Sequence, residues 1–318
     1  MPVTLADIAA ARKRIGSVVF TTPLRTSEWL SSEAAAVLLK LETIQPTCSY
    51  KIRGGLNAAR RLYEESSGPP PRLVTASAGN HGGALAYAAR ILDLPLVVFI
   101  AANAPRTKID AIRNAGADLR ECRDYDAAER EAKEYAAGGR GIFISPYSHP
   151  DVIAGAGTIG LELLEQEPDL AAVVVPVGGG GLVSGIGIAV KALSPSTRVV
   201  GVEVAASCPF TRSLEAGRLV SIDVGPSLAD GLTGNLDPDT VTLDIVREVV
   251  DEIVLVDEPL LRRALAGVIL QEHVLVEGAA AAGPAAILGG HVAFKGNVAV
   301  VLTGANIDPE KLIDVLRC

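Results

Sequence analysis

The fold follows from one stretch of sequence, Val173-Val174-Val175-Pro176-Val177-Gly178-Gly179-Gly180-Gly181-Leu182-Val183-Ser184-Gly185. Its β-branched run predicts a buried strand, and the small apolar residues at its end predict a helix. The four glycines between them predict a loop whose backbone N–H groups can approach an anion closely at the N-terminus of that helix. The stretch therefore indicates a phosphate site in an α/β fold. A purely structural glycine loop is the alternative.

The glycine loop differs from the loops that bind nucleotides. It lacks the Gly-Lys-Ser/Thr ending of a P-loop, and its glycines do not have the spacing of the dinucleotide fingerprint. Glu203 nevertheless lies at about the right distance for the acidic residue of a dinucleotide site. A non-covalent nucleotide- or phosphate-binding protein therefore stays open as an alternative function.

The composition is that of a globular protein. The chain has 318 residues, enough for about two domains, and 49% of them are hydrophobic. Its net charge of −8 argues against a nucleic-acid or anionic-membrane partner, because both need a basic excess. Residues 171–190 are uncharged, but Pro176 and the glycine loop argue against a membrane span. Four cysteines without CxxC spacing predict neither a zinc site nor disulfides, so we expect a cytoplasmic protein.

Short apolar strands alternate with Ala-rich helices, which is typical of an α/β fold with parallel sheets. We expect strands at residues 37–41, 73–75, 96–100, 142–144, 173–175, 199–202 and 298–302, and helices at 5–15, 83–91, 108–114, 126–137, 158–165 and 259–271. A Pro-rich linker at 66–71 and a softer break near 145–150 indicate two open, twisted domains with mostly parallel sheets. The large domain would comprise residues 1–70 and 148–318, and the small domain residues 71–147.

A second motif carries a lysine, in Pro46-Thr47-Cys48-Ser49-Tyr50-Lys51-Ile52-Arg53-Gly54-Gly55. Lys51 lies among small hydroxyl residues at the start of an expected helix. A Schiff-base lysine needs a lowered pKa and hence a partly desolvated pocket. Taken alone, the motif favours an ordinary helix N-terminus whose Lys51 and Arg53 face solvent.

Two further motifs follow expected strands. Thr75-Ala76-Ser77-Ala78-Gly79-Asn80-His81-Gly82-Gly83 combines small residues with Asn and His, which suits a nest of backbone N–H groups for a carboxylate. An ordinary strand-to-helix turn with Asn80 in a left-handed conformation is an equal alternative. Val300-Val301-Leu302-Thr303-Gly304-Ala305-Asn306-Ile307-Asp308 ends a buried strand with a hydroxyl residue, and taken alone it favours a turn with Asp308 as a helix cap.

Together the four motifs resemble those of the serine/threonine dehydratase family. Its members are pyridoxal 5'-phosphate (PLP) enzymes of the tryptophan synthase β-like class, fold type II. The family's Ser-Phe-Lys-x-Arg-Gly corresponds to residues 49–54, its Ser-Ala/Ser-Gly-Asn-His to 77–81, its tetraglycine loop to 178–181 and its Ser-Gly-Gly-Asn to 303–306. The resemblance extends over nearly the whole chain, and four motifs in this order are highly specific.

The resemblance implies that the chain binds PLP, and it assigns residues to the cofactor and the substrate. Lys51 would hold PLP through a Schiff base. The other cofactor-binding residues would be Tyr50 against the ring face, Asn80 at the ring hydroxyl, Thr303 at the pyridine nitrogen, and the backbone of Gly178, Gly179, Gly180 and Gly181 at the phosphate. The substrate carboxylate would lie among Ser77, Asn80 and His81.

The implied reaction is the α,β-elimination of water from an L-β-hydroxy amino acid, by default threonine or serine, to give a 2-oxo acid and ammonia. Lys51, once freed, would remove the Cα proton as general base. An amino-acid racemase on the same scaffold is the alternative enzyme, but racemases resembling this family have a serine where this chain has Ala78. As partners we expect a small amino acid and a second copy of the chain in a homodimer.

Several positions depart from the family's pattern. Cys48 stands where glycine is usual, Gly83 and Ala156 stand where glutamine is usual, and Tyr50 replaces phenylalanine. These departures leave the cofactor unchanged but extend the possible substrates to a bulkier β-hydroxy amino acid.

The resemblance also bears on metals and regulation. Some relatives bind a divalent cation through an acid at the position of Glu203, but Pro209 stands where the second acidic ligand is expected, so we predict no metal. The chain ends soon after Thr303, so we expect no regulatory domain and no feedback control by isoleucine.

Overall fold

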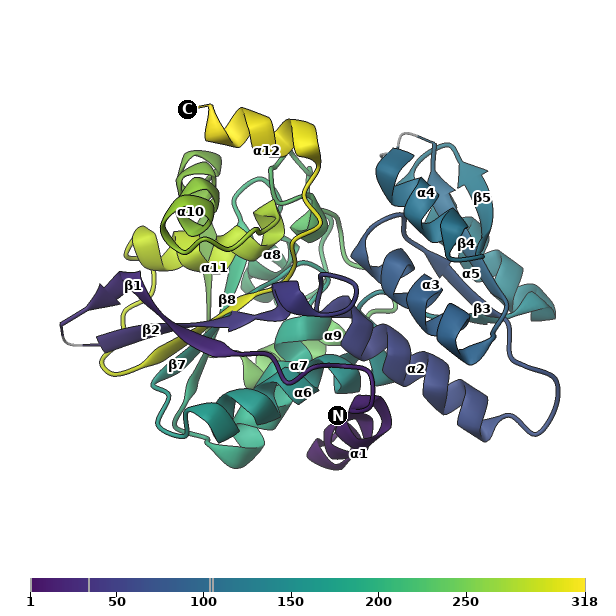
Figure 1. Ribbon diagram of the computed structural model, residues 1–318, viewed down its shortest axis with the longest axis horizontal. Helices are drawn as coiled ribbons and strands as arrows, with labels where there is room; N and C mark the ends of the chain where they lie inside the picture. Colours follow the sequence, from purple (N-terminus) through teal and green to yellow (C-terminus); the bar gives the residue numbers. More distant parts are fainter. Residues whose placement is uncertain (1, 34, 103, 105, 318) are drawn as a thin grey trace.

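The computed structural model describes residues 2–33, 35–102, 104 and 106–317, and their strands form two sheets (Figure 1). The six-stranded sheet has the order β1 (Leu24–Ser32), β2 (Ala35–Leu41), β10 (Val298–Leu302), β7 (Ala172–Pro176), β8 (Arg198–Val204) and β9 (Glu252–Val256). The four-stranded sheet has the order β5 (Asp118–Cys122), β4 (Leu96–Ala101), β3 (Leu73–Ala76) and β6 (Ile142–Phe143). Neighbouring strands pair in parallel, except that β1 and β2 are antiparallel. The predicted α/β fold with mostly parallel sheets is confirmed.

Helices cover both faces of each sheet. Those of the chain are α1 (Leu5–Ile15), α2 (Lys51–Glu65), α3 (Asn80–Leu92), α4 (Arg106–Asn114), α5 (Tyr125–Tyr135), α6 (Pro150–Gln166), α7 (Gly181–Leu193), α8 (Pro209–Glu215), α9 (Thr242–Val249), α10 (Glu258–Gln271), α11 (Gly278–Leu288) and α12 (Pro309–Leu316). Helices α10 and α11 pack on one face of the six-stranded sheet, and α6 and α7 pack on the other. Helices α2, α3 and α4 cover one face of the four-stranded sheet, and α5 covers the other. The inner strands of both sheets are therefore buried on both faces, which explains their continuous apolar runs.

We call the four-stranded sheet with α3, α4 and α5 the small unit, and the rest of the chain the large unit. The strands of the small unit all come from residues 73–143, and α2 packs against α3 from outside that range (Figure 1). The division into domains at residues 70 and 147 stays a prediction. Among the described residues, no helix is long and apolar enough to cross a membrane.

Three strands were not expected from the sequence, namely β1, β5 and β9. All three lie at the edge of a sheet, and none is buried along its whole length. In β1 and β5, polar residues interrupt the apolar pattern that marks a strand. In β9 the run Ile253-Val254-Leu255-Val256 is apolar, and this strand was missed despite its pattern.

Helix α6 begins eight residues earlier than expected. Its glycines lie against other helices: a Cβ on Gly155 would come within 2.4 Å of the Arg53 carbonyl oxygen, and one on Gly157 within 2.8 Å of that of Gly185. These glycines lower the helix propensity of the sequence, but they let α6 pack closely on α2 and α7, and this packing outweighs the propensity.

Candidate active site

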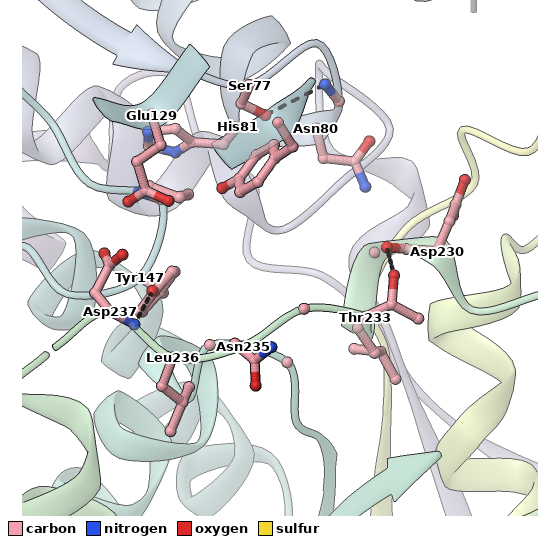
Figure 2. A pocket seen from close by; sticks show the side chains of 18 of the residues that line it. Ser77, Asn80, His81, Glu129, Tyr147, Asp230, Thr233, Asn235, Leu236 and Asp237 are labelled. Carbon is pink, nitrogen blue, oxygen red and sulfur yellow. Dashed lines mark hydrogen bonds between the residues drawn. The ribbon is translucent and has the colours of Figure 1, made fainter. Parts of the chain in front are cut away.

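A cavity of about 1310 Å³ lies between the two units. Loops that follow the carboxyl ends of β3, β7 and β10 line it, which is where ligands bind in open α/β sheets. Every residue that the sequence predicts for the site lies along its wall: Tyr50, Lys51, Ser77, Asn80, His81, Gly178, Gly179, Gly180, Gly181 and Thr303. Figure 2 shows part of this wall, with Ser77, Asn80 and His81 on one side of the cavity and the segment from Thr233 to Asp237 on the other.

Lys51 is the first residue of α2 and is half-buried in the cavity wall. Its Nζ donates a hydrogen bond of 2.8 Å to the Pro146 carbonyl oxygen and lies 5.2 Å from the centre of the Tyr50 ring. The Tyr50 N–H donates to the Thr303 carbonyl oxygen at 3.0 Å, which ties the lysine motif to the end of β10. The interpretation of Lys51 as a solvent-facing residue is therefore wrong.

Arg53, two residues further along, is 1% exposed, so it does not face solvent either. Its guanidinium contacts the Glu42 carboxylate at 2.7 Å and that of Glu162 at 2.6 Å, and Glu162 also accepts from Lys40 Nζ at 2.7 Å. Two buried cations are thus balanced by two buried anions, which anchor the first turn of α2 to β2 and α6. Removing one partner from such a buried network costs about 3–5 kcal/mol, because it leaves an uncompensated charge.

The glycine loop has no room for side chains. Gly180 has a φ of +84°, and a Cβ there would lie 2.4 Å from the Phe210 ring. A Cβ on Gly179 would lie 2.2 Å from the Tyr147 ring, and one on Gly181 would lie 2.6 Å from the Tyr147 carbonyl oxygen. Gly181 starts α7, so bare backbone faces the cavity at the positive end of a helix. This geometry fits the phosphate of PLP.

Asn80 begins α3 and belongs to a chain of side-chain hydrogen bonds. Its Nδ2 donates to Glu277 Oε1 at 2.7 Å, and its Oδ1 accepts from Asn306 Nδ2 at 2.7 Å. Its φ is not positive, so the alternative of a left-handed turn residue is wrong. Sequence reasoning missed Glu277; a Cβ on Gly304 would lie 2.6 Å from its Oε1, so the glycine of the fourth motif makes room for it.

His81 is a buried, neutral histidine. Burial, and then the charge of Lys51, lower the pKa of His81 to about 3. Its Nε2 lies 3.2 Å from the Ile144 carbonyl oxygen, which assigns the proton to Nε2 and leaves Nδ1 as an acceptor. The ring therefore brings no positive charge to the cavity.

The carboxylate of Glu203 stabilises a neighbouring helix. Its carboxylate accepts from the N–H groups of Phe210 and Thr211, each at 2.9 Å, and from the Thr211 hydroxyl at 2.6 Å. It therefore binds the N-terminus of α8, and this explains why the dinucleotide interpretation fails. Burial raises the pKa of this carboxyl. In the part of the chain that the structure describes, no group of three His, Cys, Asp or Glu residues could hold a metal ion.

Residues 15–304 match the protein family described as "Pyridoxal-phosphate dependent enzyme". The chain belongs to this family. It is 40% identical over 309 residues to the L-threonine ammonia-lyase of Thermotoga maritima, covering 96% of this chain and 76% of that protein. It is 37% identical over 314 residues to the serine racemase of Homo sapiens, covering 96% of this chain and 92% of that protein. A threonine deaminase of known structure, from T.th., superposes with a TM-score of 0.87 at 36% identity, covering 96% of this chain and 99% of that one.

The cofactor is therefore PLP, and the predicted fold type II architecture is confirmed by these relatives. The residues present fit the cofactor, because one cavity contains a lysine amine, a side-chain-free loop at a helix N-terminus, and the amide of Asn80. Membership of an enzyme family sets aside the alternative of a non-covalent nucleotide-binding protein.

Proposed function

We propose that this PLP enzyme is an ammonia-lyase that eliminates water from an L-β-hydroxy amino acid, threonine or serine by default, and yields a 2-oxo acid and ammonia. The observation that carries the proposal is that Lys51, Asn80, Thr303 and the glycine loop, which are far apart in the sequence, line a single cavity. Relatives named L-threonine ammonia-lyase support this reaction.

Four groups of this chain would hold the cofactor. Lys51 would bind it covalently, the backbone of the glycine loop would bind its phosphate, Asn80 would donate to its ring oxygen, and the Thr303 hydroxyl would face its ring nitrogen. PLP supplies an electron sink for the charge that develops at Cα. A neutral hydroxyl at the ring nitrogen weakens this sink and favours prompt elimination.

Lys51 would be the catalytic base that takes the Cα proton. The Pro146 carbonyl, which accepts from Nζ at 2.8 Å, would orient the amine when it is free. The Ser77 Oγ accepts the Gly79 N–H at 3.2 Å, so its own proton is available for the substrate carboxylate. His81 Nδ1 is an acceptor and cannot donate to that carboxylate, so we assign His81 to holding the loop through Ile144.

Racemisation is the second candidate, since several relatives are serine racemases. It needs a second acid or base on the ring face opposite Lys51. Ala78 lines the cavity in the loop where such a group would stand, and a methyl group cannot carry a proton. The structure therefore favours elimination.

The test is to incubate the purified protein with PLP and to record its visible absorbance before and after borohydride, which reduces a PLP–lysine bond. A 2-oxo acid assay over threonine, serine and bulkier β-hydroxy amino acids then gives the substrate. A missing absorbance band, or D-amino acid formed as fast as 2-oxo acid, would contradict the proposal. The homodimer and the cytoplasmic location stay predictions, and light scattering tests the first.

A further inference from the structure

An ion-pair cluster joins the two units at the edge of the cavity. Lys133 Nζ, on α5 of the small unit, lies 3.2 Å from Asp237 Oδ2 and 3.5 Å from Asp239 Oδ1, on the segment that joins α8 to α9 in the large unit. Both Lys133 and Asp237 line the cavity. The side chain of Asp237 is 12% exposed and that of Lys133 is 33% exposed, so the ion pair is partly exposed to solvent.

Asp237 is also connected to the predicted chemistry. Its N–H donates to the Tyr147 hydroxyl at 3.0 Å (Figure 2). The Tyr147 ring lies against Gly179, where a Cβ would come within 2.2 Å of the ring. The residue before Tyr147 is Pro146, whose carbonyl accepts from Lys51 Nζ. One short segment thus contacts the phosphate loop and the catalytic amine, and it is held by the same residue that pairs with Lys133.

Glu129 adds a titratable group to the cluster. It lies one turn before Lys133, with Oε1 3.3 Å from Lys133 Nζ, and it points toward Asp237 (Figure 2). Burial, then a hydrogen bond with Asp237, raises the pKa of Glu129 to about 7. The groups around Glu129 are Tyr125 and Lys133 on its own helix, Asp237 on the facing segment, and Tyr147. Asp126 acts on Tyr125, and Asp239 on the facing segment acts on Lys133.

We propose that Lys133 and Asp237 are positioning residues whose ion pair clasps the small unit to the large unit and so holds Tyr147 and Lys51 in place over the substrate. The inference rests on the proposed function, since it assigns a role in that reaction. The ion pair holds the two units around the cavity in which the substrate would bind, so we expect its loss to raise KM more than it lowers kcat. It also opens the cavity to small reagents.

The proton on Glu129 sets the direction of the pH dependence. The clasped state binds this proton more tightly than a state in which Glu129 is exposed, because the pKa of Glu129 is raised from 4.5 to about 7. The clasp therefore weakens as pH rises from 4.5 through about 7, where Glu129 becomes a second anion beside Asp237, and changes little above that. We expect a higher KM at pH 8 than at pH 6.

The experiment uses the PLP-loaded protein and the variants Lys133→Met, Asp237→Asn and Glu129→Gln. The matched control is Lys191→Met, which removes a lysine that pairs with Asp251 at 2.7 Å within the large unit. KM and kcat are measured at pH 6 and 8, together with the rate at which hydroxylamine releases PLP from the protein. This release rate reports access to the cavity without any turnover.

We expect Lys133→Met and Asp237→Asn to raise KM and the release rate by roughly fivefold, the order expected for a partly exposed ion pair, with a smaller change in kcat. Glu129→Gln, which stays neutral, should abolish the difference in KM between pH 6 and 8. Release rates equal to those of Lys191→Met, or a pH dependence that survives in Glu129→Gln, would overturn the clasp. If the unmodified protein holds PLP but turns over no substrate, the release rates still test the clasp while the proposed function fails.

Discussion

The two glycine-containing loops of the site differ in what surrounds their glycines. In the loop of residues 178–181, a Cβ on any glycine would come within 3.1 Å of a neighbouring atom. In the loop of residues 77–83, a Cβ on Gly79 would meet nothing closer than 3.9 Å and one on Gly83 nothing within 4 Å, whereas one on Gly82 would lie 1.9 Å from the Ser77 carbonyl oxygen. Packing therefore constrains every glycine of the loop at residues 178–181, but in the loop predicted to face the substrate it constrains Gly82 and leaves room at Gly79 and Gly83. This difference explains why the family's pattern is kept in the first loop and changed at Gly83.

The largest effect is expected at Lys51, which lines the same cavity as the two loops. Lys51→Ala should abolish the visible absorbance of the PLP–lysine bond and lower turnover by at least about 10⁴-fold, because the covalent role and the base role are lost together. Lys13→Ala, on the exposed face of α1, is the control and should change neither. Normal turnover in Lys51→Ala would mean that another lysine does the chemistry.

Gly180→Val tests the packed loop. We expect it to lower the free energy of unfolding by about 3 kcal/mol or more, because a β-branched residue is strained at this φ and its Cβ meets the Phe210 ring. Urea unfolding measures this loss. The matched variant is Gly79→Ala in the loop of residues 77–83, for which we expect little change in the free energy of unfolding. If Gly180 mattered only for contact with the phosphate, Gly180→Val would lose PLP while its free energy of unfolding stayed unchanged. That result would contradict the proposal that packing against Phe210 determines this loop.

The sequence predicted which residues share the cavity better than it predicted the edge strands of the sheets. The four motifs contain every residue that we propose for PLP, because three of them are contiguous runs after a buried strand and the fourth leads into the start of α2. Glu277, Glu42 and Glu162 were missed, since a buried carboxylate reveals its role only through partners far away in the chain. The pairing of Lys133 with Asp237 was missed for the same reason: each is an ordinary charged residue of a solvated segment until the two units meet.

Ala78→Ser adds a hydroxyl group to the loop of residues 77–83 and tests whether this group changes the reaction. A serine there would supply a proton donor on the ring face opposite Lys51, so we expect the D-enantiomer to become a measurable share of the product while PLP binding is kept. Chiral chromatography of the reaction mixture, alongside the 2-oxo acid assay, gives the ratio. Ala101→Ser, elsewhere on the cavity wall, is the control. An unchanged ratio would show that the residue at position 78 does not decide between elimination and racemisation.

The smallest effect is expected within the loop of residues 77–83, where Gly82 and Gly83 differ in the space around them. Gly83 is the fourth residue of α3, and a Cβ there meets no atom within 4 Å, so Gly83→Ala should raise the free energy of unfolding by about 0.5–1 kcal/mol through helix propensity alone. Gly82→Ala is the matched contrast, because a Cβ on Gly82 would lie 1.9 Å from the Ser77 carbonyl oxygen and must push the loop apart. Urea unfolding of both variants separates the two positions. If Gly83→Ala is stabilised yet has a raised KM, the space above Gly83 is used by the substrate, and the glutamine usual there in the family would then act on specificity.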